Sequence, residues 1–501
     1  MGEKKIVLSI GILASDRQDT MAKCLNSLTK IRKAIPSELI ILDTGCNRQL
    51  HELLEKHADK LEGFTWCNDF SKARNACLNL AEGQWFLYLD DDEWFADSKE
   101  IIDFFKSEEY KHYGYASYIQ RNYLDEEGSQ YTDSWVQRMI KLQEDTHFES
   151  KIHEYFVPKP GNGKNIKSIV DHYGYVYKDE EAKQKHFERN RVLLEEMIEL
   201  EPKEIRWKLQ LVQEYRSMDD YANMLQIGDD CLAKEREVYG EIPDIYLGTF
   251  YAARVLAYLG MEQYEKAVKA CKQILNQQRN TFMAQAFAYF SLARAYFFLG
   301  EYSLCVQNAE KYLEVLAVFQ RCPENFYEQQ IAPFAGECFD EVKKKEIYSL
   351  LICSGLKQGR TGELKLYLNQ LQWQEDHLYV FEKMAECLIE AMCSMKREQV
   401  FIDTLRLMQK NSALWNYLCQ EALGYQERGM DITPLVQMAE EAEKPVLSLE
   451  MQQLAEQVKT QLSILLGNGM IEQAKGIITQ VRKILPEDEE LKKMEQELAD
   501  R

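Results

Sequence analysis

The first 177 residues alternate between short apolar runs and segments with helical hydrophobic spacing. The apolar runs predict buried strands and the spaced segments predict helices. The strands are expected at residues 5–13, 38–42, 64–66 and 85–89, and the helices between them at residues 16–32, 46–61 and 70–81. This order predicts an α/β fold with a parallel sheet covered by helices. Aromatic and alternating runs in residues 113–173 predict a further antiparallel sheet that completes the domain.

The predicted strand at residues 85–89 runs directly into Asp90, Asp91, Asp92 and Glu93. Alternation along an extended chain would place Asp90 and Asp92 on one side and direct Asp91 away. Carboxylates at the end of a buried strand are costly unless a cation or a hydrogen-bonded ligand neutralises them. Hard oxygen ligands of this kind suit Mg²⁺ or Mn²⁺, usually together with substrate phosphates. The alternative is a solvated acidic loop after a strand.

Polar groups also follow the other predicted strands. Ala14, Ser15 and Asp16 follow the first strand, Asp43 follows the second, and Asn68 and Asp69 follow the third. The carboxyl ends of parallel strands meet at one edge of a sheet, where ligands bind, so a nucleotide is expected there. The sequence contains neither GxGxxG nor GxxxxGK[ST], and therefore indicates neither a dinucleotide site nor a P-loop.

Beyond residue 177 the strand pattern stops and leucine, alanine, glutamine, glutamate and lysine recur with helical spacing. Residues 183–200 predict a helix that tethers the two regions. Leu259-Gly260 and Leu299-Gly300 each separate two helical segments, as in tetratricopeptide repeats of irregular spacing. Stacked repeats present a concave surface that often binds peptides, although they could instead support dimerisation. The expected domains are residues 1–177, a linking helix at 178–202, and a helical repeat domain at 203–501.

The charge and cysteine content limit the partners and the compartment. A net charge of −21 over 501 residues argues against nucleic acid, because phosphates require a broad basic face. The 13 cysteines form no CxxC pair, which fits reduced thiols and a cytoplasmic location. No apolar run approaches the roughly 20 residues that cross a bilayer, so no membrane span is expected.

Ordered motifs along the first 200 or so residues carry a resemblance to a known family. They are Asp43-Thr44-Gly45, residues 68–75, residues 89–94, Arg138-Met139, His153-Glu154 and residues 172–175. The set resembles family 2 glycosyltransferases of the GT-A fold, the Rossmann-like fold of nucleotide-diphospho-sugar transferases. It resembles a branch in which helical repeats follow the GT-A domain, and within it the bacteriocin peptide S-glycosyltransferases, which attach sugars to cysteine.

The resemblance implies a donor-binding set. Asp43 would accept a hydrogen bond from the nucleobase, and Ala14 would lie beside it at the end of the first strand. Arg74 would contact the nucleotide, unless it makes a surface ion pair, as helical arginines often do. Asp90 would hold ribose or sugar hydroxyls, and Asp91 completes the set although alternation directs its side chain away.

The resemblance also implies a metal site and a catalytic base. Asp92 would ligate Mn²⁺ or Mg²⁺, and a neutral His172 could complete the shell. Glu154 is preferred as base over His153, because neighbours on a strand face opposite ways, and Asp133 is a more distant candidate. Either histidine could instead be a buried, hydrogen-bonded ring.

Together these features predict a metal-dependent inverting glycosyltransferase. The donor is expected to be a UDP-sugar rather than a GDP-sugar, and the acceptor a peptide or protein recruited by the repeats. A homodimer is possible. The alternatives are a transferase of surface polysaccharide or glycolipid assembly, and a non-catalytic scaffold that keeps the sugar-nucleotide fold.

Overall fold

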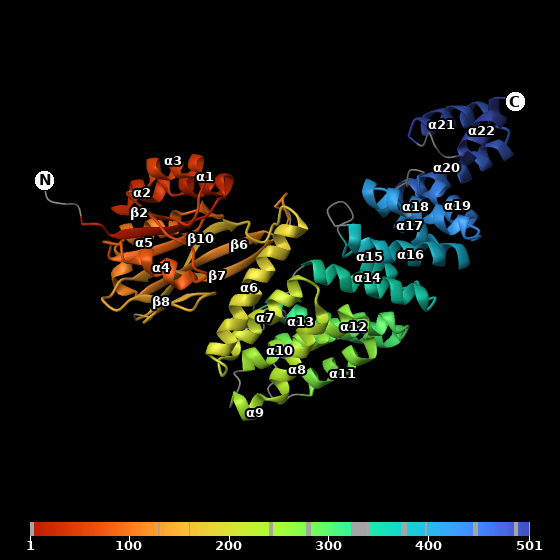
Figure 1. Cartoon of the computed structure of the whole chain (residues 1–501). Helices are drawn as coiled ribbons and strands as arrows, with labels where there is room; N and C mark the ends of the chain where they lie inside the picture. Colours follow the sequence, from red (N-terminus) through yellow and green to blue (C-terminus); the bar gives the residue numbers. More distant parts are fainter. Residues whose placement is uncertain are drawn as a thin grey trace. The chain divides into compact units, whose positions relative to one another are not determined.

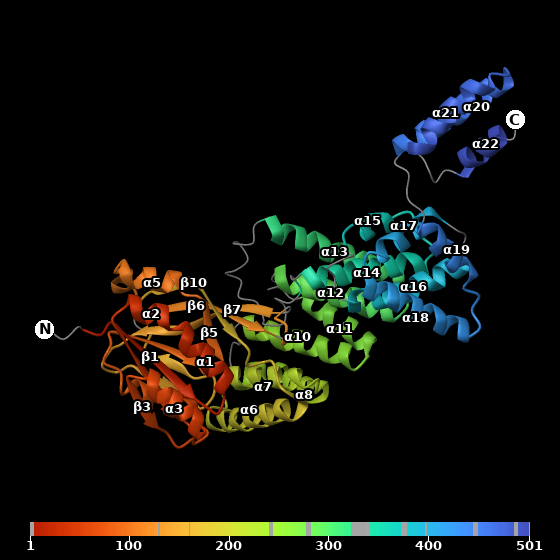
Figure 2. The ribbon, with the colours of Figure 1, turned by 90° about the horizontal axis from the view of Figure 1, so that it is seen from above.

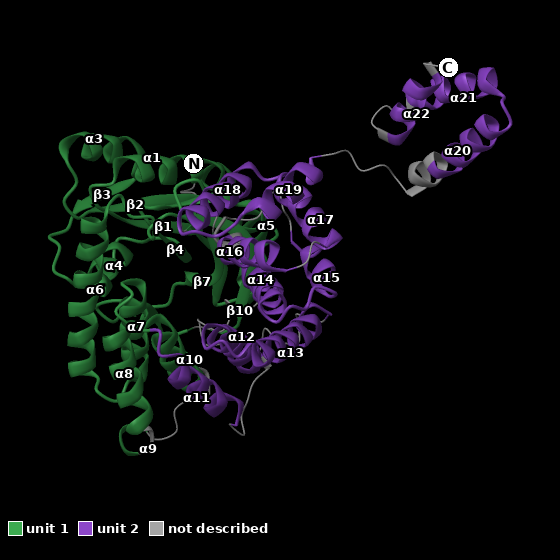
Figure 3. Ribbon diagram, turned by 90° about the vertical axis from the view of Figure 1, so that its right-hand side faces the viewer, with its two compact units in different colours: residues 1–261 green, residues 262–501 purple. Residues whose placement is uncertain are grey.

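The computed structural model describes residues 5–123, 125–128, 131–159, 161–239, 244–276, 282–321, 338, 341–371, 378–395, 398–443, 449–484 and 489–499. The chain divides into two compact units, Met1–Met261 and Glu262–Arg501 (Figure 3). We call them the N-terminal unit and the C-terminal unit and describe each by itself. The expected fold class, an α/β sheet domain followed by an all-helical region, is confirmed.

The N-terminal unit contains one mixed sheet of eight strands in the order β3-β2-β1-β4-β7-β6-β10-β5, and a separate hairpin of β8 and β9 (Figure 1). The strands are β1 Leu8–Ala14, β2 Ser37–Asp43, β3 Lys60–Gly63, β4 Trp85–Asp90, β5 Glu93–Asp97, β6 Tyr115–Tyr123, β7 Tyr131–Lys141, β8 His147–Glu149, β9 Tyr155–Val157 and β10 Gly163–His172. The first four strands pair in parallel, as their strand–helix order predicted. Their carboxyl ends therefore meet at one edge of the sheet.

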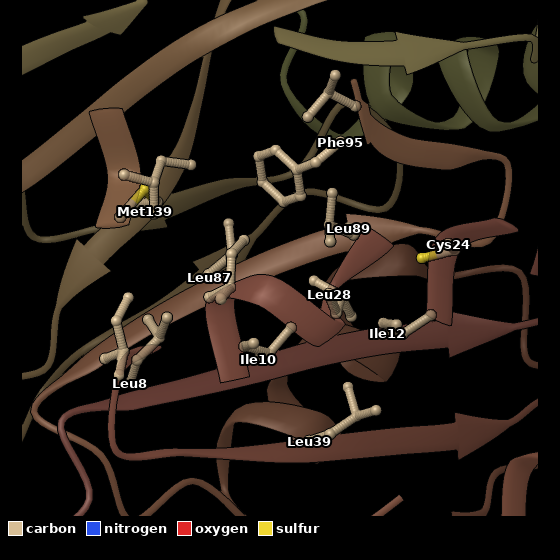
Figure 4. Close-up of a cluster of buried hydrophobic side chains, with 14 of the residues drawn as sticks. Leu8, Ile10, Ile12, Cys24, Leu28, Leu39, Leu87, Leu89, Phe95 and Met139 are labelled. Atoms are coloured by element: carbon tan, nitrogen blue, oxygen red, sulfur yellow. The ribbon is translucent and has the colours of Figure 1, made fainter. Parts of the chain in front are cut away.

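Ten α-helices and one short 3₁₀ helix are described in the N-terminal unit. They are α1 Gln18–Ser27, α2 Thr29–Ala34, α3 Arg48–His57, α4 Phe70–Leu78, α5 Lys99–Lys106, η1 Glu109–His112, α6 Glu180–Leu200, α7 Ile205–Ser217, α8 Tyr221–Ala233, α9 Glu235–Val238 and α10 Asp244–Gly260. One face of the sheet packs against α1, α2, α3 and α5, in the apolar cluster drawn in Figure 4. The other face packs against α4, β8 and β9.

Several local predictions need correction. The single helix expected at residues 16–32 divides at Leu28, whose backbone begins a second short helix. The strand expected at residues 64–66 is wrong, because β3 ends at Gly63 and those aromatic residues follow it. Strand β5 and helix α5 were not predicted. Strands β6, β7 and β10 extend the main sheet rather than forming a second one, and β10 runs parallel to β6.

Helices α6 and α7 pack directly on the sheet domain. Leu193, Leu194 and Met197 of α6 form an apolar cluster with Trp207 and Leu211 of α7. The cluster also contains Ile152, from the segment between β8 and β9, and Phe70 packs against it. Figure 2 shows α6, α7 and α8 side by side, and neighbouring members of this set are in contact. The first helices after the sheet thus belong to the same packed unit as the sheet itself.

The C-terminal unit is helical wherever it is described, apart from turns and loops between the helices. Its helices are α11 Tyr264–Leu275, α12 Phe282–Phe298, α13 Tyr302–Arg321, α14 Glu341–Lys357, α15 Leu364–Leu368, α16 Leu378–Ser394, α17 Gln399–Met408, α18 Ser412–Glu427, α19 Thr433–Ala442, α20 Leu449–Gly467, α21 Ile471–Ile484 and α22 Glu489–Ala499. Helices α12 and α13 pack as a pair, and Gly300 in the turn between them has φ of 76°, where glycine is favoured. Within the described ranges, every helix is too short or too polar to cross a membrane.

Candidate active site

A cavity of about 1050 Å³ lies at the carboxyl end of β4. Its sheet side is formed by β7, the ends of β1 and β10, and residues 152–156. Its helical side is formed by α6 and α7. The cavity is lined by six of the residues predicted from the sequence, namely Asp90, Asp91, Asp92, His153, Glu154 and His172. Ala14, Asp43 and Arg74 do not line it. The structure therefore brings most of the predicted set together.

Asp91 does not point away from the cavity. Strand β4 ends at Asp90, and Asp91 and Asp92 form a turn before β5, so strand alternation no longer applies to them. The Asp91 carboxylate accepts hydrogen bonds from the Ser15 N–H at 2.6 Å and the Ser15 hydroxyl at 2.5 Å. Burial raises the pKa of Asp91 to about 6, although the Arg17 guanidinium opposes the rise. Asp91 therefore fixes the loop after β1 at the edge of the cavity.

Arg74 is buried beneath the acids rather than exposed on its helix. Its side chain is only 2% exposed, so the surface ion pair considered from the sequence is wrong. Its Nη1 donates to the carbonyl of Leu89 at 3.2 Å, its Nε donates to Glu154 Oε1 at 3.1 Å, and its Nη2 pairs with Asp90. One guanidinium thus positions the strand-end acid Asp90 and the candidate base Glu154 together.

Arg138 also reaches Asp90, and it does so because of a β-bulge. Ala116 of β6 pairs with Met139 of β7, but the next residue, Ser117, pairs with Gln137. Arg138 is therefore the extra residue on β7. A bulge bends its strand and changes the direction of the local side chains. Here the result is a second arginine at the carboxyl end of β4.

Arg138 and Glu93 both contact Asp90 and hold it in place. Arg138 Nη2 lies 2.8 Å from Asp90 Oδ2 and 3.0 Å from Glu93 Oε1. The fully buried Glu93 accepts hydrogen bonds from Gln120 and, at 3.1 Å, from the Asp90 N–H. Burial alone would raise the pKa of Asp90, but the charges of Arg138 and Arg74 outweigh it and hold the pKa well below its ordinary value. Asp90 is therefore ionised at neutral pH.

His153 and Glu154 lie in an irregular segment between β8 and β9, not on a strand. The strand argument for choosing between them is therefore wrong, and both side chains line the cavity. Ser150 and His153 have φ of 81° and 51°, a left-handed conformation that is strained for residues with a side chain. His153 is exposed to the cavity, where partial loss of solvent together with the nearby Arg189 and Arg206 lowers its pKa to about 4, so the ring is neutral at pH 7.

Asp92 and His172 form a site that fits a cation. His172 Nε2 lies 3.7 Å from Asp92 Oδ1, and His172 Nδ1 lies 2.7 Å from the side-chain oxygen Oδ1 of Asn122. Asn122 thereby holds the proton on Nδ1 and leaves the Nε2 lone pair facing Asp92. A Cβ at Gly174 would overlap the His172 ring and lie 3.0 Å from Asp92 Oδ2, so glycine keeps this space open. The Arg17 guanidinium contacts Asp92 from the other side.

Two protein ligands are fewer than a divalent cation needs. In the part of the chain that the structure describes, no three His, Cys, Asp or Glu side chains gather around one point. Mg²⁺ and related ions commonly take one or two carboxylates and complete their shell with substrate phosphates and water. The Asp92 and His172 pair fits that mode of binding rather than a resident structural metal.

Asp43 and Ala14 stabilise the loops at the sheet edge outside the cavity wall. They are paired in the register of β1 and β2. Asp43 Oδ1 accepts hydrogen bonds from the N–H groups of Gly45 at 2.9 Å and Cys46 at 2.7 Å, and Oδ2 lies 2.6 Å from His51 Nδ1. Burial would raise the pKa of Asp43, but these hydrogen bonds lower it to about 2. The partly exposed His51 would have to move for Asp43 to contact a nucleobase.

The helical wall adds polar groups that the motifs do not include. His186, Arg189 and Asn190 of α6 and Gln210 and Glu214 of α7 line the cavity. Burial, together with Arg189 and Arg17, lowers the pKa of His186 to about 4. The cavity thus has an acidic sheet side and a mixed, arginine-containing helical side.

The model of the glycosyl transferase family 2 matches residues 9–158, which contain β1 to β9. The N-terminal domain is a family 2 glycosyltransferase domain. Glycosyltransferase SunS of Bacillus subtilis (strain 168), derived from its SPbeta prophage, is 27% identical over an alignment of 228 residues that covers 42% of this chain and 50% of SunS. The chain therefore spans about half the length of the curated relatives it matches first.

Two further proteins are similar to this chain. A TPR repeat-containing protein of Synechococcus elongatus is 33% identical over 93 residues, covering 19% of this chain and 22% of that protein. The crystal structure of S. aureus TarS 1-349 in complex with UDP-GlcNAc superimposes with 13% identity and a TM-score of 0.28, covering 65% of this chain and 93% of that chain. A TM-score of that size does not establish a shared fold.

The sequence motifs assigned no role to four residues of the site, namely Arg138, Gly174, Arg17 and Arg189. Arg138 stands within a quoted motif, but only the bulge register reveals its contacts. Gly174 stands in the motif after His172, and only the closeness of the His172 ring explains why this residue is glycine. Arg17 and Arg189 have no sequence signal beyond their charge, because each reaches the site by packing of distant elements.

Proposed function

We propose that the chain is a metal-dependent inverting glycosyltransferase that uses a nucleoside diphosphate sugar, preferably a UDP-sugar, as donor. The observation that carries this proposal is the Asp92 and His172 pair, kept open by Gly174 at the edge of a large cavity. The family 2 domain supports the donor class. Asp92 and His172 would hold Mn²⁺ or Mg²⁺, which would neutralise charge on the departing diphosphate.

In the proposed reaction, Glu154 removes a proton from the acceptor. Its Oε1 is fixed by Arg74, whereas its Oε2 has no hydrogen-bond partner among the described residues and remains available to the acceptor. The acceptor atom bonds to the anomeric carbon as the bond from that carbon to the diphosphate oxygen breaks, with inversion. The neutral His153 beside it is the second candidate base.

We further propose that the acceptor is a peptide or protein and that the C-terminal unit recruits it. The support is the similarity of part of the chain to a TPR repeat-containing protein, since stacked helical repeats often bind peptides. The similarity to SunS, a glycosyltransferase, favours the same class of reaction.

The donor part of the proposal is tested by thermal shift with UDP- and GDP-sugars, with and without Mn²⁺. Stabilisation by a sugar nucleotide that requires the metal is expected, because ligand binding raises stability by mass action. The Asp92→Asn variant should remain folded and lose this stabilisation together with metal-dependent turnover. Full activity in Asp92→Asn would remove Asp92 from the mechanism. Mass spectrometry of candidate peptides and glycans after incubation separates the acceptor classes.

A further inference from the structure

The α6 side chain Arg189 faces the cavity without a carboxylate partner. Its Nε and Nη2 donate to the side-chain oxygen Oδ1 of Asn190 at 3.1 and 2.9 Å, and no ion pair joins it to any described acid. The other arginines at the site, Arg17, Arg74 and Arg138, each contact at least one carboxylate. Glu214 attracts the partly buried guanidinium and is linked to it through Asn190, but no described carboxylate bonds to it directly, so a bound anion would stabilise it further.

Neighbouring side chains hold the Arg189 guanidinium in one orientation. Asn190 is buried, and its amide nitrogen donates to Glu214 of α7 at 2.9 Å, so the amide oxygen that receives Arg189 cannot turn away. The guanidinium also lies over the Phe70 ring, 5.4 Å from its centroid. A guanidinium has five N–H donors, and only those on Nε and Nη2 are directed at Asn190. The Nη1 group is left for a ligand.

Helix α6 is fixed firmly enough to position that group. Its apolar face packs with α7 against Ile152, two residues before the candidate base Glu154. Lys151 Nζ, from the same segment, pairs with Glu196 of α6 at 2.7 Å. The helix can be followed in Figure 1 along the side of the sheet domain. Helix α6, which carries Arg189, therefore packs directly on the segment that contains Glu154.

The charges around Arg189 indicate which anion fits. Arg17 repels Arg189 across the cavity, whereas Glu214 and, more weakly, Asp92 attract Arg189. Asp92 also attracts Arg17. A group with more than one negative charge, placed between the two guanidiniums and beside the cation ligands Asp92 and His172, relieves this repulsion. Guanidinium groups suit phosphate because their planar donors match its oxygens.

We propose that Arg189 binds the diphosphate of the sugar donor and stabilises it as the leaving group, an inference that rests on the proposed function. When the bond between the anomeric carbon and the diphosphate oxygen breaks, the electron pair stays on that oxygen. Arg189 donates hydrogen bonds to the diphosphate oxygens as their charge increases, and no proton is transferred. The first helix beyond the family 2 match thus completes the donor site.

The test compares three full-length variants by calorimetry with Mn²⁺ present. Arg189→Gln removes the charge, Arg189→Lys keeps the charge but loses the planar donors, and Arg191→Gln is the matched control. Arg191 stands on the same helix and pairs with Glu188 and Glu195 instead. The probes are UDP, GDP, inorganic pyrophosphate and uridine. Thermal unfolding of each variant is measured beside binding.

Arg189→Gln is expected to weaken binding of the diphosphate probes roughly 10- to 100-fold, as for loss of a charged hydrogen bond, and to leave uridine binding unchanged. Arg189→Lys should lose less, and Arg191→Gln nothing. Unchanged diphosphate affinity in Arg189→Gln, or an equal loss in Arg191→Gln, would overturn the inference. If Arg189→Gln does not fold, wild-type affinity in Arg189→Lys overturns it. Failure of the wild-type chain to bind any nucleoside diphosphate would instead refute the proposed function.

Discussion

Replacing Arg74 with methionine tests the buried charge network directly. Arg74 is the only described cation in contact with Glu154, whereas Asp90 would keep Arg138. The substitution therefore leaves one nearly buried carboxylate, Glu154, without a counter-charge. Breaking a buried ion pair by removing one partner costs about 3–5 kcal/mol. Since whole domains are stable by about 5–15 kcal/mol, this is a large fraction of the stability of the N-terminal unit.

Urea unfolding followed by tryptophan fluorescence measures this loss at pH 7.5. The signal reports mainly the N-terminal unit, which contains Trp66, Trp85, Trp94, Trp135 and Trp207 out of seven tryptophans in the chain. Arg74→Met combined with Glu154→Gln should lose less than the sum of the single variants, with a coupling of about 1–3 kcal/mol. Because the double variant also removes the charge of Glu154, the coupling energy measures the interaction between Arg74 and Glu154.

Lys72→Gln is the control on the same helix. Lys72 is 68% exposed and pairs with Asp69 at 3.4 Å, and an exposed pair of this kind contributes about 0–1 kcal/mol. A loss below about 1 kcal/mol in Arg74→Met, or additive losses in the double variant, would contradict the network that we describe.

Two further predictions concern the cation site and the sheet edge. Gly174→Ala should abolish the Mn²⁺-dependent part of donor binding in calorimetry, because a Cβ there overlaps the His172 ring; Gly63→Ala, where a Cβ meets nothing within 4 Å, should not. Retained metal dependence in Gly174→Ala would exclude this site. Asp43→Asn should lower the free energy of unfolding at pH 7 by about 2 kcal/mol, since hydrogen bonds hold the Asp43 pKa at about 2 in the folded chain, below the ordinary aspartate pKa of about 3.9. That contribution is present above about pH 4 and is lost as the pH falls towards 2, so urea titrations of wild type between pH 4 and 2 should slope more steeply than those of Asp43→Asn.

The sequence predicted the parallel half of the sheet because each buried strand there is a continuous apolar run. It placed β1, β2 and β4 to within a few residues, and missed β3 because the aromatic run at residues 64–66 outweighed the polar strand Lys60–Gly63. A strand at the edge of a sheet carries few apolar residues, so its pattern is weak. Topology from residue 93 onward depends on pairing between distant strands, which local patterns do not specify.

The candidate site could be predicted as a set of residues but not as an arrangement. The motifs indicated Asp92, His172 and Glu154, and the structure brings all three to one cavity. The motifs could not show that Arg74 is buried under Glu154. The sequence pattern around a helical arginine does not distinguish a side chain that faces solvent from one that faces the core. Nor could they show the α6 wall, which depends on packing of residues 180–217 against the segment before β9. The domain boundaries at residues 177 and 202 remain a prediction beside the compact unit that ends at Met261.

Because Arg138 is the extra residue of a bulge, the number of residues in β7 determines whether this arginine reaches Asp90. A substitution at Arg138 removes its ion pairs with Asp90 and Glu93 but does not test the bulge that places it there. Deleting the single codon for Arg138 would let Gln137 and Met139 keep their partners Ser117 and Ala116 without interruption, so both the bulge and the arginine would be lost. For any redesign of this domain, counting residues along that strand matters as much as choosing them.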